Sequence, residues 1–461
     1  MKKHISICLA ILLLPLTVSG QALRGSYFFD SSIQRVKMNP AFAPKTNYAT
    51  IPVLGDLSLT VNSNIGVSNF LFPKGGELYP YLNQNVTSAE FQAALPNHPS
   101  IKMAMDMDVL GAGFYVGPKG FVTFDVGSRV NLRMDVPSEL FVFLKDGMAK
   151  DTYNFKDFAI SQDAYLQVSG GYRRDLGDLV PGLTVGAKLK LLFGLEKVDM
   201  RINNAQIKMG QDKWELTTDA EGSIYGKGVT FSEGQEDGEM PSVNLDTQNL
   251  GLAGFGFAVD LGAEYKLPLD IPVLDGINFS ASVVDLGTIF YSDENVSKLQ
   301  SKGSASFEGL RDINAQFDVD ESLKKIAADF MALANFEEVQ GVGGSSAITP
   351  KAYVGVEAPM LNNLMSVGLL YSYMYGINDL TLSYNLKVKN IFNVGLNYSM
   401  LNNAKSMGFL VEFIPRNGVA IFLGTDYLNL QYTPQGLPVD KLIMNAKFGL
   451  NATFGSKHAR K

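Results

Sequence analysis

The sequence is poor in the side chains that most often perform chemistry. It contains one cysteine, Cys8, and three histidines among 461 residues. Because Cys8 lies in a stretch that we expect to be removed, the mature chain would hold no thiol, which excludes disulfides, thiolate metal sites and cysteine nucleophiles. The mature histidines are His98, which precedes Pro99, and His458 in a basic tail. We therefore expect no enzyme activity, cofactor or metal, since neither a histidine triad nor a metal-binding motif is present.

Excess positive charge and long apolar runs are also missing. Lys and Arg number 39 against 46 Asp and Glu, a formal net charge of -7. This balance argues against nucleic acid as a partner. After Leu16 the chain has no run of about 18 apolar residues, the length that a membrane-spanning helix requires. Any membrane crossing by this chain would therefore use strands.

Residues 1–20 are typical of a secretory signal peptide. Lys2, Lys3 and His4 form the positive region, an apolar core runs from Ile5 to Leu16, and small residues follow before Gln21. A retained membrane anchor is the alternative, but the apolar core is short for a bilayer of about 30 Å. We predict that the mature chain begins at Gln21.

Lys441 to Phe454 carries the clearest strand pattern. Apolar residues occupy every second position, while the opposite face holds Asn445, Lys447, Gly449, Asn451 and Thr453, with Ile443 as the exception. Alternation of this kind is typical of a strand, and its span of roughly 40 Å suits a tilted strand that crosses a bilayer. Lipid and lumen would then take alternate side chains.

Similar segments recur along the chain with turn residues between them. We predict strands at residues 103–116, 121–134, 164–172, 183–202, 206–218, 252–265, 277–290, 353–358, 365–375, 380–388, 392–400, 407–414 and 419–427. With the last strand these give about 14, an even number as bacterial barrels require. We therefore assign residues 57–67 to the N-terminal part, which places residues 135–161 on the periplasmic side. A soluble β-sandwich is the alternative.

Three connections carry helical signals. Thr87 and Glu90 form a capping box, and Pro137-Ser138-Glu139 begins a short apolar turn that runs to Leu144. Residues 321–339 place an apolar stripe within a long loop, residues 291–350. That helix would either cover the barrel mouth or bind a partner. Asp106 and Asp108 fit adjacent lumen-facing carboxylates better than a calcium site, and the acidic residues 234–239 fit a solvated loop.

The N-terminal segment, residues 21–55, combines prolines with a short aromatic cluster. We predict an irregular piece packed against something larger, and its candidate plug or ligand-contact residues are Tyr27, Phe28, Phe29, Asn39, Pro40 and Phe42. The stretches SYFFDSSIQRVKMNPAFAP and IPVLGDLSLTVNSNIGVSNFLFP resemble the opening of an uncharacterised family of Bacteroidota outer-membrane β-barrels. A more distant resemblance is to long-chain fatty-acid transporter barrels, and it implies an N-terminal segment that plugs the lumen.

The last strand also resembles the closing-strand signal of bacterial outer-membrane proteins. Lys447, Gly449, Ala452 and Phe454 match its pattern of a polar residue, a glycine and two hydrophobic residues, although Ala452 is small and a tail, residues 455–461, follows. This resemblance implies the barrel-assembly machinery and outer-membrane lipid as partners.

We predict an all-β fold, a transmembrane antiparallel β-barrel of about 14 strands formed by residues 56–454. Its leading function would be the passage or binding of a small ligand, which could be hydrophobic. The rival function is a structural or secretion-associated scaffold whose loops bind protein.

Overall fold

The structure is a computed structural model with side chains. It describes residues 23–147, 150–210, 214–227, 229–232, 242–245, 251–269, 271, 273–307, 337–339, 343–374, 377–389, 391–400, 406–429 and 442–455. The predicted signal peptide and most of the basic tail lie outside the described residues. No described helix has the length and apolar character needed to cross a membrane.

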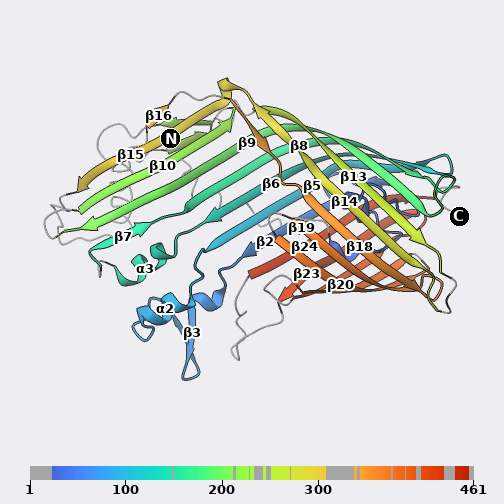
Figure 1. Ribbon diagram of the computed structural model, residues 1–461, viewed down its shortest axis with the longest axis horizontal. Helices are drawn as coiled ribbons and strands as arrows, with labels where there is room; N and C mark the ends of the chain where they lie inside the picture. The colour runs from blue at the N-terminus through green and yellow to red at the C-terminus, as the bar shows by residue number, and fades with distance from the viewer. Residues whose placement is uncertain are drawn as a thin grey trace.

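The described chain forms a closed β-barrel of 14 antiparallel strands (Figure 1). The predicted fold class is therefore confirmed. Around the wall the strands are β1 (Asn47–Thr50) and β2 (Asp56–Ser63), which share one position, then β5 (Ser100–Val116), β6 (Gly120–Asp135), β8 (Phe158–Asp175), β9 (Leu183–Met209), β13 (Gly254–Leu267), β14 (Ile277–Tyr291), β18 (Lys351–Met360), β19 (Met365–Met374), β20 (Ile377–Val388), β21 (Phe392–Ser399), β22 (Ser406–Phe413), β23 (Gly418–Asn429) and β24 (Leu442–Phe454).

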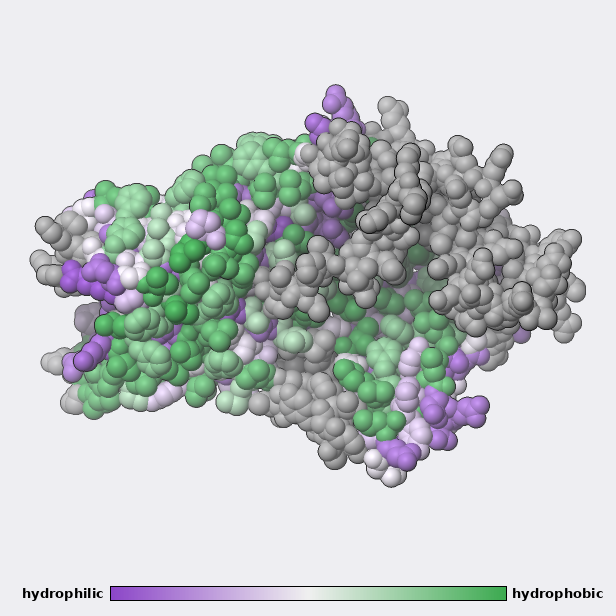
Figure 2. Space-filling model, turned by 180° about the vertical axis from the view of Figure 1, so that it is seen from behind, coloured by the Kyte–Doolittle hydropathy of each residue, from purple (hydrophilic) through white to green (hydrophobic). Residues whose placement is uncertain are grey.

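The two faces of the wall differ as the alternation predicts. In β24, Asn445, Lys447 and Asn451 are buried on the inner face, while Met444 is exposed on the outer face. The same two-residue period sends apolar side chains outward on the neighbouring strands, so Figure 2 shows a broad hydrophobic surface over the wall. A closed wall with an apolar outer face and a polar inner face is the pattern of outer-membrane barrels.

β24 closes the barrel against β1 and β2, which corrects the assignment of residues 57–67 to the N-terminal part. Leu57 pairs with Phe448 on one side and with Met107 on the other. Ser58 and Thr60 are buried on the inner face, so this segment has the alternation of a wall strand. The barrel wall therefore begins at Asn47, before the predicted boundary at residue 56.

The connections divide the barrel into two unlike ends. At the short-turn end the connections are residues 117–119, 176–182, 268–276, 361–364, 389–391 and 414–417. At the long-loop end the longest are residues 64–99, 210–253 and 292–350, and residues 136–157 also lie there. Residues 136–157 thus lie at the end opposite to the short turns. The expectation grouped residues 135–161 with the periplasmic side, where short turns are usual. They lie instead at the other end from the short turns, because β1 and β2 add one wall position before them. Which end faces the periplasm stays a prediction.

One half of the wall extends further at the long-loop end, as Figure 1 shows for β9, β10 and β15. β9 pairs with β13 up to Gly194 and then with β10 (Trp214–Gly226), which pairs with β15 (Val296–Phe307). The predicted turn at residues 203–204 is wrong, because β9 continues to Met209 and reverses after it. The remaining strands are β7 (Thr152–Phe155), β11 (Val229–Ser232), β12 (Ser242–Leu245), β16 (Glu337–Val339) and β17 (Gly344–Ala347).

Two predicted loop helices are confirmed at the long-loop end. They are α2 (Ser88–Ala94), capped by the Thr87 and Glu90 box, and α3 (Ser138–Asp146). With η3 (Val67–Asn69) and the hairpin of β3 (Leu71–Lys74) and β4 (Glu77–Pro80), they pack around Phe91 and Tyr153 in an aromatic cluster. A further 3-10 turn is η4 (Asp293–Asn295). Most of the predicted helix at residues 321–339 lies outside the described residues, but residues 337–339 form β16, a strand.

Candidate functional site: the filled lumen

The N-terminal segment, defined here as residues 23–46, lies inside the barrel. It consists of two 3-10 turns, η1 (Arg24–Ser26) and η2 (Gln34–Lys37), joined by irregular backbone, and most of its residues are buried. Its contacts reach opposite sides of the wall. The backbone N–H groups of Arg24 and Gly25 donate to Asp426 on β23, and the Ser282 hydroxyl on β14 donates to the Met38 carbonyl. The segment therefore fills the lumen and then continues directly into β1.

The aromatic residues of this segment sit in hollows that wall glycines create. A Cβ added to Gly368 would overlap the Phe28 ring, well inside the 3.0 Å that real Cβ contacts respect, and one at Gly355 would lie 2.7 Å from Tyr27. A Cβ at Gly395 would lie 3.0 Å from the Phe29 ring. A larger residue at any of these positions would displace a ring, so the wall and the segment are complementary in shape.

Two apolar clusters result from this fit. In the first, Tyr27 lies edge-on to Phe28 and Phe42, with ring centroids 5.1 and 5.0 Å apart. In the second, Phe29 packs with Leu23 and with Leu410 and Phe422 of the wall.

Asn39 and Pro40 hold the next part of the segment against the wall. The Asn39 amide nitrogen donates to the Ala263 carbonyl at 3.1 Å, while its oxygen accepts from the Ala41 N–H at 2.9 Å. Pro40 lies against Gly186 on β9. The structure thus brings all six candidate residues of the N-terminal segment into the lumen. Their contact with a ligand stays a prediction.

Arg24 anchors the beginning of the segment. Its guanidinium forms a buried ion pair with Asp379 on β20, lies 3.6 Å from Asp426, and stacks 4.4 Å from the centre of the Tyr427 ring. A buried charge of this kind needs its partners, because removal of one leaves the other charge uncompensated. Sequence reasoning missed these residues, although Asp379 and Asp426 stand at inner-face positions of alternating strands.

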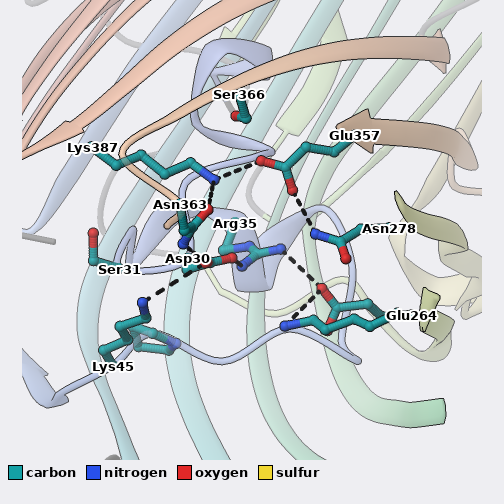
Figure 3. A network of polar contacts seen from close by, with 12 residues as sticks. Asp30, Ser31, Arg35, Lys45, Glu264, Asn278, Glu357, Asn363, Ser366 and Lys387 are labelled. Carbon is teal, nitrogen blue, oxygen red and sulfur yellow. Dashed lines mark hydrogen bonds and ion pairs between the residues drawn. The ribbon is translucent and has the colours of Figure 1, made fainter. Parts of the chain in front are cut away.

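A polar network holds the segment at the short-turn end (Figure 3). Arg35 lies between Asp30, at 3.1 Å, and Glu264 of β13, at 3.5 Å. Asn363 donates to Asp30 at 2.7 Å and accepts from Lys387. Lys387 also pairs with Glu357 at 2.6 Å, and Asn278 donates to the same carboxylate at 3.0 Å.

Charge dominates the environment of Asp30. Burial alone would raise the pKa of Asp30, but the surrounding cations Lys387, Lys266, Arg35 and Lys45 outweigh burial and hold this pKa well below its ordinary value. Burial lowers the pKa of Lys45. The Asp30 carboxylate opposes this shift, but the neighbouring cations lower the pKa further. Cations therefore crowd around this part of the segment.

A layer of buried charge lies deeper in the lumen. It surrounds a cavity of about 30 Å³ and holds six carboxylates, Asp56, Asp106, Asp108, Asp125, Asp260 and Asp285, and six cations, Lys37, Arg129, Lys188, Lys190, Lys351 and Lys447. Lys37 connects the N-terminal segment to Asp56 and Asp108. The predicted lumen-facing position of Asp106 and Asp108 is confirmed, because Asp106 pairs with Arg129 at 3.0 Å on the inner face.

Asp285 shows how the wall positions one of these charges. Its φ of 63° lies in the left-handed region, which is strained for a non-glycine residue, at a register shift between β13 and β14. The Asp285 N–H donates to Asp260, and its carboxylate reaches both Lys190 and Lys351, the latter at 2.9 Å.

The other residues singled out in the sequence do not join this site. His98 lines a separate hollow at the long-loop end, and the described residues contain no group of three or more His, Cys, Asp or Glu side chains arranged to hold a metal ion. His458 and residues 234–239 lie outside the described residues. Of the closing-strand residues, Lys447 pairs with Asp56 at 3.0 Å and Gly449 faces the lumen, while Phe454 is exposed at the strand end. Recognition of these residues by an assembly machinery stays a prediction.

Comparison with known proteins adds the following. The model of a family of unknown function (DUF5723) matches residues 40–426. No curated protein matches the sequence. Among solved structures, the toluene transporter TbuX of Ralstonia pickettii is 9% identical, with a TM-score of 0.36 over 92% of this chain and 95% of that chain. The toluene transporter TodX of P. putida is 11% identical, with a TM-score of 0.38 over 92% and 94%.

A third similar structure is the translocator domain of the autotransporter NalP from Neisseria meningitidis. It is 6% identical, with a TM-score of 0.30 over 89% of this chain and 88% of that chain. Because these identities and TM-scores are low, the functions named for the three proteins are not evidence of what this chain binds.

Proposed function

The chain belongs to the DUF5723 family, whose function is unknown, and we propose from the geometry of its lumen that it is a gated outer-membrane barrel. Its N-terminal segment is the plug, and a small ligand passes only when this plug moves. We propose no catalytic activity.

The filled lumen is the observation that carries this proposal. With the N-terminal segment in place, the cavity inside the central layer of charge measures about 30 Å³, far below the roughly 300–1,000 Å³ of ligand-binding pockets. A ligand of ordinary size does not fit into such a space. Passage through the barrel therefore requires the segment to move.

The contacts that hold the segment are of a reversible kind. Arg24, Arg35 and Lys37 pair with carboxylates that belong to the wall. In a lumen that fills with water, these charges exchange protein partners for hydration, which offsets much of the loss of each ion pair. A displaced segment would thus leave a hydrated and polar lumen.

Apolar hollows on the wall suggest the class of ligand. Tyr27, Phe28 and Phe42 occupy a cluster with Tyr353 and Met374 of the wall. If these rings withdraw, the glycine-lined hollows would offer flat apolar contacts beside charged groups. We propose that a small hydrophobic or amphipathic ligand uses these contacts.

The location of the barrel forms part of the same proposal. We propose that residues 1–20 are cleaved, that the apolar outer face contacts outer-membrane lipid, and that the barrel-assembly machinery recognises β24. The resemblance of the N-terminal stretches supports an origin in Bacteroidota.

A scaffold is the second candidate function, and one observation favours it. At the long-loop end α2, α3 and the hairpin of β3 and β4 pack into an aromatic cluster of their own around Phe91 and Tyr153. Such a cap could present a surface to another protein while the lumen stays closed. The two functions differ in whether anything passes through the barrel.

Removal of the N-terminal segment separates these functions. The mature chain and a variant that lacks residues 21–44 are compared in planar bilayers, and both are tested for uptake of a long-chain fatty acid into lipid vesicles. We expect low conductance and ligand uptake for the mature chain, and a large, unselective conductance for the truncated chain. The deletion ends before β1, so the wall strands remain complete.

Two results would contradict the gated barrel. Equal conductance of the two proteins would show that the segment does not obstruct the lumen. Absence of uptake by the mature chain, together with a wide pore in the truncated chain, would favour the scaffold with a permanently closed lumen.

A further inference from the structure

A second cavity, separate from the central one, borders the N-terminal segment at the short-turn end. It measures about 600 Å³ and lies between the segment and the wall strands β5, β8, β9 and β13. Its charged lining consists of four cations, Arg35, Lys45, Arg173 and Lys266, and three carboxylates, Asp30, Asp175 and Glu264. The lining thus has one more cation than carboxylates.

Two of the carboxylates are already shared between cations. Asp30 lies 3.1 Å from Arg35 and 3.8 Å from Lys45, and Glu264 lies 3.5 Å from Arg35 and 3.7 Å from Lys266. Each carboxylate therefore compensates only part of the charge around it. The pKa of Lys45 is lowered mainly by its burial; Asp30 opposes this shift, and the neighbouring cations add to it.

Of the four cations that line this cavity, Arg173 is the one that forms no ion pair with a carboxylate of the described residues. Its Nε donates to the Ala41 carbonyl at 3.1 Å and its Nη2 donates to the Thr184 hydroxyl at 3.5 Å. Among the described residues no carboxylate lies within 4.0 Å of it, and the nearby Asp175 accepts instead from the Gly177 N–H. A guanidinium has five N–H groups, so three remain to serve a ligand in the cavity.

We propose that this cavity binds a small oxyanion, a carboxylate or a phosphate, with Arg173 as its main contact and Lys45 and Lys266 beside it. The planar guanidinium presents paired N–H groups that match two oxygens of such an anion, and charge-assisted hydrogen bonds of this type are strong. Lys45 belongs to the N-terminal segment, whereas Arg173 and Lys266 belong to the wall. A bound anion would therefore touch both. The proposal goes beyond gated passage, because binding here requires no transport.

The test is calorimetric titration of the mature chain in detergent micelles with inorganic phosphate and, separately, with acetate. The variant Arg173→Gln is compared with Arg174→Gln. Arg174 is the next residue of β8, is exposed on the outer face, and donates to the Tyr172 hydroxyl. Both variants remove one positive charge from the same strand, but only the first changes the cavity. Circular dichroism checks that both remain folded.

We expect saturable binding of at least one anion by the unmodified chain, an affinity at least tenfold lower in Arg173→Gln, and unchanged affinity in Arg174→Gln. Lys266→Gln should weaken binding to a smaller degree. Absence of saturable binding, or an equal loss in both arginine variants, would overturn the proposal. Binding is measured without a membrane potential or uptake, so its failure would leave the gated barrel intact, and a failure of gating would leave this site intact.

Discussion

At the scale of single residues, the shape of the lumen depends on side chains that are absent. Gly355, Gly368 and Gly395 lie on three different wall strands, and each leaves space for one aromatic ring of the N-terminal segment. A glycine within a strand costs stability, since it offers no side chain for packing. The close approach of Tyr27, Phe28 or Phe29 to the backbone explains why each of these positions holds a glycine.

This fit predicts the outcome of a single substitution. In Gly368→Val the new side chain would occupy the space of the Phe28 ring, and overpacking of this kind costs about 1–3 kcal/mol. We expect the N-terminal segment to be displaced from the lumen more often, which single-channel recordings would show as more frequent open events. The matched control is Gly170→Val, at a strand glycine whose added Cβ would meet nothing within 4 Å.

A second substitution checks the cause. Phe28→Ala in the Gly368→Val chain removes the ring that collides, so the open events should become rarer again. If Gly368→Val and Gly170→Val behave alike, then Phe28 does not depend on this hollow and the assigned fit is wrong.

At the scale of elements, the sequence predicts most wall strands. The predicted strands from residue 353 onward agree with β18 to β24 within a few residues, because short turns there interrupt a strict two-residue period. Two errors have separate reasons. An even strand count favours leaving residues 57–67 outside the wall, but most of them belong to the wall strand β2. The asparagines at residues 203–204 are typical of a turn, but β9 continues through them.

The alternation of apolar and polar residues also does not show which residues the inward-facing side chains contact. Asn451 stands on the polar face of β24, yet it is buried and donates to the Gly55 carbonyl. Arg24 pairs with Asp379 and Asp426, and both lie more than 350 residues after Arg24 in the sequence. No local sequence pattern shows that such distant residues pair. The site could therefore be identified only from the three-dimensional structure.

The outer face of β9 gives a test at this scale. Leu189 is 56% exposed between the inward-facing Lys188 and Lys190. If the outer face contacts lipid, Leu189→Lys near the bilayer midplane should lower the free energy of unfolding by about 2–4 kcal/mol. The control is Leu179→Lys, at a leucine that is 78% exposed in the turn between β8 and β9. Denaturant unfolding in lipid vesicles measures both, and an equal, small effect would place Leu189 in water.

At the scale of the whole molecule, three layers close one lumen. The polar network around Asp30 lies at the short-turn end. The aromatic rings in their glycine hollows and the twelve buried charges lie further inside, where Tyr353 and Met374 pack with the rings and also line the cavity that the charges surround. The N-terminal segment contributes to each layer. The central claim is therefore that movement of this one segment controls the barrel.

A reversible crosslink tests that claim most directly. The sequence from residue 21 onward contains no cysteine. A Cβ at Gly25 would lie 3.5 Å from the Cβ of Leu410 on β22, a separation that a disulfide accepts. Gly25→Cys with Leu410→Cys would lock the N-terminal segment to the wall. Gly222→Cys with Leu299→Cys joins β10 to β15 at the same 3.5 Å and leaves the segment free, so it is the control.

The measurement is fatty-acid uptake by vesicles that contain each crosslinked protein, before and after reduction with dithiothreitol. We expect that the oxidised Gly25–Leu410 crosslink abolishes uptake, that reduction restores it, and that the control pair transports equally in both states. Undiminished uptake by the fully oxidised Gly25–Leu410 crosslink would contradict the account, because the ligand would then pass without movement of the segment.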